Sequence, residues 1–387
     1  MIDVAEVRQA LEETGADGWL LFAFKGLNPV AVRVLGLTGM NSRRLFALFP
    51  RQGEPVVIAH KIELQGLENF PGRVVPYARW SELHEALAEL VAGRTLAMEV
   101  SPRDAVPYLD RVPYGVVELL QSLGARIVPS GALVSRFAAR WSPREIADHR
   151  HAAEILAEVA RSTLEQAVHE GGGRLTESAL QARVIAAVEG RGLVFDEHPP
   201  IVGFGPNSAM PHYEPHPGQD AVLQQGDLVL LDLWAGRSQE TVFADQTWIG
   251  FAGSRVPPRV SEVWQTVRRA RDAAIETIRR AAAERRVIAG YEADRAARAV
   301  VEAAGFGEAF VHRTGHSIDR DLHGSGPHLD DYETHDDRLL LPGVGFSVEP
   351  GIYLPGAFGI RSEVNVFMGP TGPEVTPREP QSELITA

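Results

Sequence analysis

The stretch LVLLDLWAG, residues 228–236, is a run of strand-forming apolar residues interrupted by one acid, Asp232. A carboxylate inside such a run is unusual, because the ion loses its hydration when the strand is buried. The same pattern recurs in three later segments: VFADQTWIG (242–250) with Asp245, GFSVEPGIYL (345–354) with Glu349, and GIRSEVNVFM (359–368) with Glu363. These four acids lie in segments that are expected to form buried strands, so they are candidates for both a structural and a chemical role.

Four acids on four apolar segments have two interpretations: separate strand-end or solvent-facing residues, or one buried cluster. Two carboxylates about 4 Å apart repel each other by roughly 4 kcal/mol at an effective dielectric constant of about 20. Burial costs each ion several kcal/mol more. Two divalent cations would compensate the negative charge and leave room for a bridging hydroxide. The pattern therefore favours a two-metal site.

The segment FVHRTGHSIDRDLHG, residues 310–324, carries His312, His316 and His323. A helical HxxxH pair could bind zinc, but the Thr-Gly dipeptide between the first two histidines favours a strand followed by a turn. One face of a strand cannot present both of these histidines to the same ion. We therefore expect one metal ligand here, with the other histidines acting as polar groups at the substrate.

Composition narrows the class of protein. The chain has 387 residues, 44% hydrophobic and 23% charged, as expected for a globular protein of two domains. No apolar run reaches about 18 residues, so we expect no transmembrane helix, and the first residues lack a signal-peptide layout. The net charge of −13 argues against nucleic acid or an anionic membrane as partner. The absence of cysteine fits a cytoplasmic protein and leaves oxygen and nitrogen as metal ligands.

The chain divides into two predicted domains. Residues 1–135 alternate short apolar strands with helical patterns, which is typical of an α/β domain, and they contain no cluster of histidines and carboxylates. A boundary follows at 136–142. The sequence SPRE (142–145) then combines an N-cap serine, a proline at the first helical position and a capping glutamate, which predicts a helix start.

The second predicted domain, residues 140–387, consists of two helices followed by strands, twice over. Its helices are expected after residue 142 until GGG (171–173), from about Thr176, and over about 258–285 and 291–304. This order predicts an internally duplicated α+β domain with helices on one face of a sheet. The Pro-rich, polar tail from about residue 370 is expected to be a loosely held terminus.

At this point the chain resembles a known family. GHSIDRDLH, FSVEPGIY and GIRSEV, in this order after LLDLWAG and FADQTW, look like the metal-binding strands of the pita-bread metallopeptidases. These include Xaa-Pro dipeptidase (prolidase), Xaa-Pro aminopeptidase and methionine aminopeptidase. The resemblance is close over roughly 140–387, and residues 1–135 are similar to the first domain of the creatinase/prolidase branch. It implies an α+β fold: a creatinase-like α/β domain for oligomerisation and active-site cover, then a catalytic pita-bread domain with a pseudo-two-fold duplicated helix-pair/sheet unit.

The resemblance implies five metal ligands. Asp232 would bind the first metal and Asp245 would bridge both. His316 and Glu349 would bind the second metal, and Glu363 would bridge again. This oxygen-rich set with one imidazole favours two Mn²⁺ ions, with Co²⁺ or Zn²⁺ as alternatives. Such a pair would turn a bridging water into a nucleophile at neutral pH.

The resemblance also implies catalytic roles. Glu349 would shuttle a proton for that water. His212, in the substrate loop GPNSAMPHYEP (205–215), would face the scissile bond or the leaving proline. His323 would hydrogen-bond the scissile carbonyl. Arg361 would lie near the metals, where it would either neutralise surplus carboxylate charge or bind substrate.

The chain departs from the family pattern at several positions. Val242 replaces a tyrosine, Trp248 interrupts the usual D-x-T-R-T, and Gly324 follows His323 where a glutamate is usual. An unusually polar loop, HLDDYETHDDR (328–338), comes next. Because the ligands remain, we expect hydrolysis to remain, whereas pocket shape and substrate choice are affected.

Three further residues of this region have two interpretations each. Arg338 is either an anchor for a substrate carboxylate or a solvated surface arginine. His312 and His328 either reach the pocket or have surface or structural roles.

These features predict a two-metal hydrolase that cleaves Xaa-Pro dipeptides through a metal-bridging hydroxide, its substrate a small peptide with proline at the second position. The alternatives are an Xaa-Pro aminopeptidase acting on longer peptides, a metal-free creatinase-like enzyme, or a non-catalytic pita-bread binding module. All five ligand positions are filled, which disfavours the last two. The resemblance also implies a homodimer in which one subunit's first domain covers the other's active site.

Overall fold

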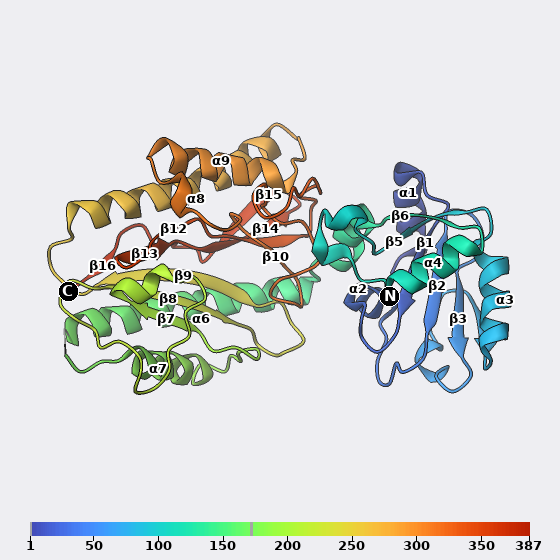
Figure 1. Cartoon of the computed structure of the whole chain (residues 1–387), viewed down its shortest axis with the longest axis horizontal. Helices are drawn as coiled ribbons and strands as arrows, with labels where there is room; N and C mark the ends of the chain where they lie inside the picture. The colour runs from blue at the N-terminus through green and yellow to red at the C-terminus, as the bar shows by residue number, and fades with distance from the viewer. Residues whose placement is uncertain (1, 171–172) are drawn as a thin grey trace. The chain divides into compact units, whose positions relative to one another are not determined.

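A computed structural model describes residues 2–170 and 173–387 (Figure 1). The chain separates into two units, Met1–Ala138 and Ala139–Ala387. Two of the three glycines predicted to end the first long helix, Gly171 and Gly172, lie outside the described residues. In the described part of the chain, no helix is both long enough and apolar enough to cross a membrane.

The N-terminal unit is built on one six-stranded mixed sheet. Its strand order is β4-β3-β2-β1-β5-β6, and β1 pairs antiparallel with β2 but parallel with β5. The strands are β1 (Gly18–Ala23), β2 (Leu45–Pro50), β3 (Val56–His60), β4 (Arg73–Tyr77), β5 (Thr95–Met98) and β6 (Arg126–Pro129). The helices are α1 (Val4–Thr14), α2 (Pro29–Leu35), α3 (Trp80–Val91), α4 (Tyr114–Ser122) and α5 (Gly131–Leu133).

Helices cover both faces of this sheet, which explains why β1 is buried along its whole length. Side chains alternate between the two faces of a strand. Trp19 and Leu21 accordingly pack with α1 and α2, whereas Leu20 and Phe22 pack with α3 and α4. The predicted α/β architecture of this part of the chain is therefore confirmed.

The C-terminal unit has the predicted order of two helices followed by strands, twice over. Its helices are α6 (Pro143–Glu170), α7 (Glu177–Glu189), α8 (Pro258–Ala283) and α9 (Gly290–Ala303). Its strands are β7 (Ile201–Phe204), β8 (Leu228–Ala235), β9 (Ala244–Phe251), β10 (Ser317–Ile318), β11 (Gly345–Val348), β12 (Gly351–Leu354), β13 (Phe358–Arg361), β14 (Val364–Gly369), β15 (Gly372–Thr376) and β16 (Ile385–Thr386).

Local sequence determines where these helices begin. The Ser142 N–H donates to Glu145 Oε2 at 2.7 Å, and the Glu145 N–H donates to Ser142 Oγ at 3.3 Å. This reciprocal capping box is the one predicted for α6. Thr176 caps α7 in a similar way, since its Oγ1 accepts the Ala179 N–H at 3.2 Å.

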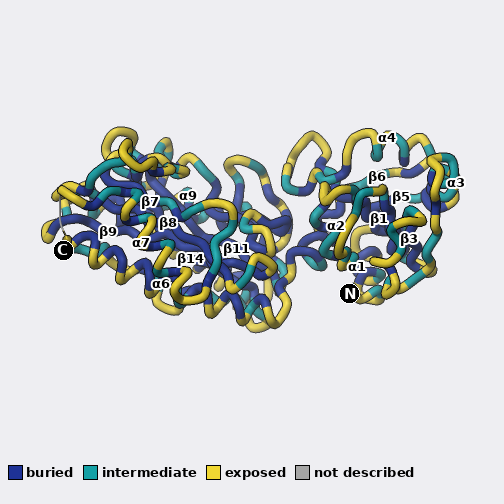
Figure 2. Tube along the Cα trace, turned by 90° about the horizontal axis from the view of Figure 1, so that it is seen from below, coloured by how far each residue is buried: buried dark blue, intermediate teal, exposed yellow. Residues whose placement is uncertain are grey.

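The strands form two four-stranded sheets, β16-β9-β8-β7 and β10-β11-β14-β15, and a short β12-β13 hairpin. Figure 1 shows α6 and α7 on one side of these strands and α8 and α9 on the other. The strands between them are mostly buried (Figure 2). The strands therefore form the inner part of this unit.

The alternation of β8 explains why Asp232 points inward. Leu231 and Leu233 pack with α6 and α7, whereas Leu228 and Leu230 lie in the other core cluster, with α8 and α9. Asp232 lies two residues after Leu230 and is therefore on the same face of the strand, so its side chain points away from α6 and α7. It lies between the two halves of the unit.

The second half presents a polar face in the same direction. Phe346 and Val348 of β11 belong to the α8/α9 core, which leaves Ser347 on the opposite face of the strand. Asn365 of β14 occupies a similar position, and its Oδ1 accepts the Asp245 N–H at 2.8 Å. The polar faces of the two sheets therefore meet inside the unit.

The prediction of a loosely held tail is wrong. β15 pairs with β14, and β16 adds a parallel strand to β9. Gln381, between them, is buried and bonds both backbone groups of Ile249, accepting from the N–H at 2.9 Å and donating to the carbonyl at 2.7 Å. The side-chain amide of Gln381 makes the two hydrogen bonds that a neighbouring strand would make. Polar composition alone does not predict such a contact.

Candidate metal centre

A cavity of about 850 Å³ opens in the C-terminal unit. Its lining includes all eight residues singled out from the sequence: His212, Asp232, Asp245, His316, His323, Glu349, Arg361 and Glu363. They come from the loop between β7 and β8, from β8, β9 and β13, and from the segments around β10, β11 and β14. Residues up to 151 positions apart in the chain thus share one cavity, while their individual roles stay predictions.

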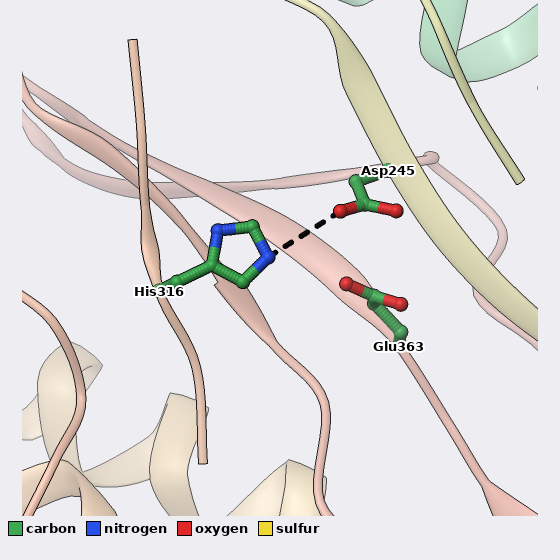
Figure 3. Close-up of side chains that lie close together, drawn as sticks. All are labelled: Asp245, His316 and Glu363. Atoms are coloured by element: carbon green, nitrogen blue, oxygen red, sulfur yellow. Dashed lines mark ion pairs between the residues drawn. The ribbon is translucent and has the colours of Figure 1, made fainter. Parts of the chain in front are cut away.

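Asp245, His316 and Glu363 point toward one another at the base of the site (Figure 3). One ligand atom of each lies within 4.8 Å of the other two, and all three side chains are buried. His316 Nε2 lies 3.4 Å from Asp245 Oδ2 and 3.4 Å from Glu349 Oε1. This spacing allows a metal ion to replace the direct contacts between the side chains.

Asp232 has a different partner. The Arg361 guanidinium donates from Nη2 to Asp232 Oδ2 and from Nε to Thr247 Oγ1 at 2.8 Å. Burial raises the pKa of Asp232 to about 7, although Arg361 opposes the shift. This ion pair places a positive charge beside the carboxylates, while the two roles expected for Arg361 stay predictions.

Neighbouring hydroxyls orient the acids. Thr247 Oγ1 donates to Glu363 Oε2 at 2.7 Å, and Ser347 Oγ donates to Glu349 Oε1 at 2.9 Å. Ser347 Oγ also accepts the His316 N–H at 2.9 Å, so one serine places a carboxylate and an imidazole together. Such partners fix the rotamers of metal-binding side chains.

The electrostatics indicate an excess of negative charge. Burial, then the neighbouring Asp245 and Glu349, raises the pKa of Glu363 well above its usual range. Burial alone would lower the pKa of His316, but Asp245 and Glu349 raise it above its ordinary value. A divalent cation between these groups would neutralise the charge that causes both shifts.

Two carboxylate oxygens indicate whether the residues of this cluster are suited to bind metal ions. Within the described part of the chain, Asp245 Oδ1 and Glu363 Oε1 are buried and have no hydrogen-bond partner. A buried carboxylate oxygen without a donor is costly, and the cost disappears if the oxygen binds a cation. The donor set, four carboxylates and one imidazole, suits a pair of Mn²⁺-like ions. The residues therefore fit the group.

His323 lies beside this cluster. Its ring meets the His316 ring edge-on, with centroids 4.3 Å apart, and the charge of His316 followed by burial lowers its pKa to about 3. The loop is tightly folded: the Gly324 N–H donates to the Ser317 carbonyl at 2.7 Å. A Cβ on Gly324 would lie 2.8 Å from Asp319 N, which explains the glycine in place of the usual glutamate.

The other histidines have structural partners. His312 Nε2 lies 2.9 Å from Tyr353 Oη and Nδ1 lies 2.7 Å from the Arg313 carbonyl. His328 is buried and its Nδ1 accepts the Ser317 N–H at 3.0 Å. His212 differs, since it is exposed and lines the cavity.

Arg338 fits neither expected role. It is buried rather than solvated, and it pairs with Asp336 and donates to the Ser325 carbonyl at 2.6 Å. The described cavity lining includes no residue of 324–338, so this polar loop lies away from the described cavity surface. Asp336 also accepts the His328 N–H at 2.9 Å. The polarity of the loop thus serves its own folding.

Val242 likewise lies away from the cavity lining. It is fully buried in a small cluster with Trp141, Ile318 and Phe367. Because the side chain does not reach the described pocket surface, an influence of Val242 on substrate choice would have to act through packing.

Sequence reasoning missed one residue that supports the wall of the cavity and one that lines it. Glu177 is fully buried, and its carboxylate accepts from the Phe204 N–H at 2.6 Å and from Tyr213 Oη at 2.7 Å. It thereby fixes the loop that carries His212. Arg320 lines the cavity and sits in the quoted segment GHSIDRDLH. An arginine between two aspartates is typical of a solvated surface segment, so the pattern did not indicate a role at the cavity.

Comparisons with known proteins agree on the family. The pattern of metallopeptidase family M24 matches residues 147–370. The chain is similar to a protein of Mycobacterium tuberculosis named "Probable dipeptidase PepE", with 30% identity over 348 residues, 88% of this chain and 85% of that protein. It is also similar to the Xaa-Pro dipeptidase of Pyrococcus horikoshii, with 25% identity over 300 residues and 77% of each chain.

A solved structure extends the likeness to the fold. The dipeptidase PepE of Mycobacterium ulcerans has a TM-score of 0.75 against this chain, covering 99% of it and 97% of that protein. At 24% identity this likeness shows the fold alone. It includes an N-terminal unit, in agreement with the resemblance to the creatinase/prolidase branch.

Proposed function

The chain belongs to metallopeptidase family M24, and from this premise we propose that it hydrolyses Xaa-Pro dipeptides with the help of two divalent cations. The observation that carries the proposal is the convergence of five potential ligands on one cavity, two of them with unpaired buried oxygens. The relatives support the substrate class unequally. Both names given above contain dipeptidase, whereas only one specifies proline.

The ligands would divide between two metals. Asp232 would bind one ion, His316 and Glu349 the other, and Asp245 and Glu363 would bridge. When bound, the ions would lower the pKa of a water molecule and polarise the scissile carbonyl. Mn²⁺ is our expectation, with Co²⁺ or Zn²⁺ as alternatives.

The protein's own groups then act on the proton and the carbonyl. Glu349, whose Oε1 accepts a hydrogen bond from Ser347 Oγ at 2.9 Å, would accept the proton of that water. The low pKa of His323 keeps its imidazole neutral at neutral pH. A neutral ring N–H can donate to the carbonyl oxygen as negative charge develops there.

A prolyl bond explains the need for a dedicated site. The bond has no N–H, and proline restricts the residue that precedes it. A site that activates water and holds the carbonyl does not depend on the missing donor. His212, exposed at the cavity, would face the scissile bond or the leaving proline. The homodimer and the cytoplasmic location stay predictions, as does the covering role of the first domain.

The first test compares two substrates after chelation, with and without added Mn²⁺. Metal-dependent release of proline from Ala-Pro, with Ala-Pro-Ala resistant, is the expected result. Cleavage of Ala-Pro-Ala after alanine would instead make the protein an aminopeptidase. Failure on both substrates with metal bound would refute cleavage of Xaa-Pro bonds.

Two histidine variants separate metal binding from turnover. His316→Ala should lose metal and activity together, because it removes the only predicted nitrogen ligand. His323→Ala should keep its metal but lose turnover by about a hundredfold, as for loss of one oxyanion donor. Metal content by plasma mass spectrometry beside kcat distinguishes them. Full metal and rate in His316→Ala would contradict the ligand assignment.

A further inference from the structure

The cavity is rich in acids and poor in cations. Beyond the predicted ligands, Asp196, Glu197, Glu214 and Asp321 line it. Within the described residues its arginine and lysine side chains are Arg320 and Arg361 alone. A peptide carboxylate entering such a cavity meets repulsion unless a cation receives it.

Arg361 is not that cation. It is buried, and its guanidinium is held by Asp232 and Thr247 beside the predicted metals. Another anion there would have to displace Asp232 from an ion pair inside the protein, at a high desolvation cost. Arg320 is therefore the guanidinium that the cavity can offer to a ligand.

Arg320 is also held in place. Its Nε donates to Glu145 Oε1 at 2.9 Å, and Glu145 is itself fixed by the capping box of α6. Among the described contacts this bond uses Nε, which leaves the two terminal nitrogens of the guanidinium for another acceptor. The side chain is 54% exposed, so a ligand can reach it.

Hydrogen bonds hold the backbone around Arg320, and the same turn leads to His323. Asp319 accepts the Asp321 N–H at 2.9 Å and the Ser325 N–H at 2.9 Å. His323 follows in the same turn and contacts the His316 ring. The turn thus presents a cation and the predicted carbonyl donor to one cavity, with a fixed offset between them.

From this arrangement we propose that Arg320 binds the free C-terminal carboxylate of a dipeptide substrate and so restricts the site to dipeptides. The inference rests on the proposed function, because it assigns the substrate end that lies beyond the scissile bond. A guanidinium binds a carboxylate through two parallel N–H bonds, a geometry that a mid-chain amide cannot match. In a longer peptide an amide would occupy this position, and the pairing would be lost.

The test uses ligands that cannot be hydrolysed, so that binding is measured apart from turnover. Ketomethylene analogues of Ala-Pro and Ala-Ala, each as free acid and as C-terminal amide, are titrated calorimetrically into Mn²⁺-loaded protein. The wild type should bind the acid of at least one pair about tenfold to a hundredfold more tightly than its amide. Arg320→Met should bind both forms alike, at the level of the amide. Arg320→Lys should keep part of the preference, since a lysine is a point charge without the fork.

Arg237→Met is the matched control. Arg237 also pairs with an acid of α6, Asp148, at 3.4 Å and is 55% exposed, but it is not among the described residues that line the cavity. It should leave the acid preference unchanged. Equal binding of acid and amide by the wild type in both pairs, or a preserved preference in Arg320→Met, would overturn the anchor.

Turnover judges the proposed function separately. If the wild type prefers the acid form yet hydrolyses Ala-Ala and not Ala-Pro, the anchor stands and the proline specificity fails. If Ala-Pro is cleaved and Arg320→Met binds acid and amide as the wild type does, the anchor fails and the proposed function stands.

Discussion

A single buried carboxylate in the N-terminal unit and the cluster of buried carboxylates in the C-terminal unit differ in how many hydrogen bonds their oxygens accept. Glu99, at the end of β5, is fully buried, and both of its oxygens accept hydrogen bonds: Oε1 from Trp19 at 2.7 Å and Ser130 at 2.9 Å, Oε2 from Asn28 at 2.7 Å. In the metal centre, Asp245 and Glu363 each keep one buried oxygen without a partner among the described residues.

The difference separates a structural acid from a binding site. Burial raises the pKa of Glu99 as it raises that of Glu363, so neither burial nor the shift distinguishes the two. The two sites differ because in the metal centre several carboxylates lie close together and some of their oxygens have no hydrogen-bond partner among the described residues. A carboxylate whose two oxygens both accept hydrogen bonds links the elements that donate to it. A cluster with unpaired oxygens still has acceptors that can bind a cation.

The largest expected effect is the loss of a bridging carboxylate. Asp245→Asn should remove metal binding and lower kcat/KM by at least about a thousandfold, equivalent to about 4 kcal/mol of transition-state stabilisation. Metal content and hydrolysis of Ala-Pro are measured on the same preparation. Full metal occupancy in this variant would remove the distinction drawn from the unpaired oxygens.

Glu99→Ala should have the opposite profile. The variant leaves the donors of Trp19, Asn28 and Ser130 buried without an acceptor, so unfolding free energy should fall by about 3–4 kcal/mol. Metal content and kcat should stay at wild-type values while the protein is folded. Urea unfolding followed by circular dichroism measures the change.

Glu118→Ala, at an exposed glutamate of α4, is the control for Glu99→Ala and should change stability by less than about 0.5 kcal/mol. A loss of metal in Glu99→Ala would show that a saturated acid can affect the site, contrary to the comparison.

An imidazole extends the comparison to pH. His149 is buried, with Nδ1 2.9 Å from the Phe243 carbonyl and Nε2 2.9 Å from Thr376 Oγ1, and burial lowers its pKa to about 4. A lowered histidine pKa means that the folded state binds the proton less well than the unfolded state. Its stability contribution is present above about pH 6.5 and is lost as the pH falls toward 4, by up to about 3 kcal/mol.

Urea midpoints of the wild type and of His149→Gln, measured from pH 7 to pH 4.5, test this sign. The wild type should lose stability more steeply with acid than the variant. Parallel pH profiles would show that the neutral, doubly bonded imidazole contributes nothing to the acid sensitivity of the C-terminal unit.

The smallest expected effect concerns the chelated protein. Burial and the neighbouring Asp245 and Glu349 raise the pKa of Glu363 well above its usual range, so keeping this acid in the metal-free cluster costs stability. Glu363→Gln keeps an acceptor for Thr247 and removes that cost, so it should stabilise the metal-free protein by about 1–2 kcal/mol. Mn²⁺ should then raise the unfolding midpoint of the wild type far more than that of the variant. A destabilised metal-free variant would mean that Glu363 is a saturated acid like Glu99.

Sequence alone went far where the signal is local. The capping box at Ser142 and Glu145 predicted the start of α6, and runs of apolar residues predicted the strands that carry Asp232 and Asp245. Glu363 was placed inside a strand, but it lies between β13 and β14, because a short break is invisible in an alternating pattern.

The family motifs predicted which residues meet in the cavity, since each motif is a short segment with its own residues. The sequence by itself determined the two-domain order, the repeated pairs of helices and the set of candidate ligands. All of these depend on neighbouring residues or on short segments.

Tertiary structure alone decided the roles of isolated polar residues. In the sequence, four such residues are similar, because each is a charged or polar residue in a loop or at a helix end: Glu177, Arg320, Arg338 and Gln381. Arg338 stabilises its own loop, and Gln381 takes the place of a strand partner. Glu177 holds the loop that carries His212, and Arg320 lines the cavity. Their partners lie far away in the chain or across a turn, and only folding brings donor and acceptor to within 3 Å.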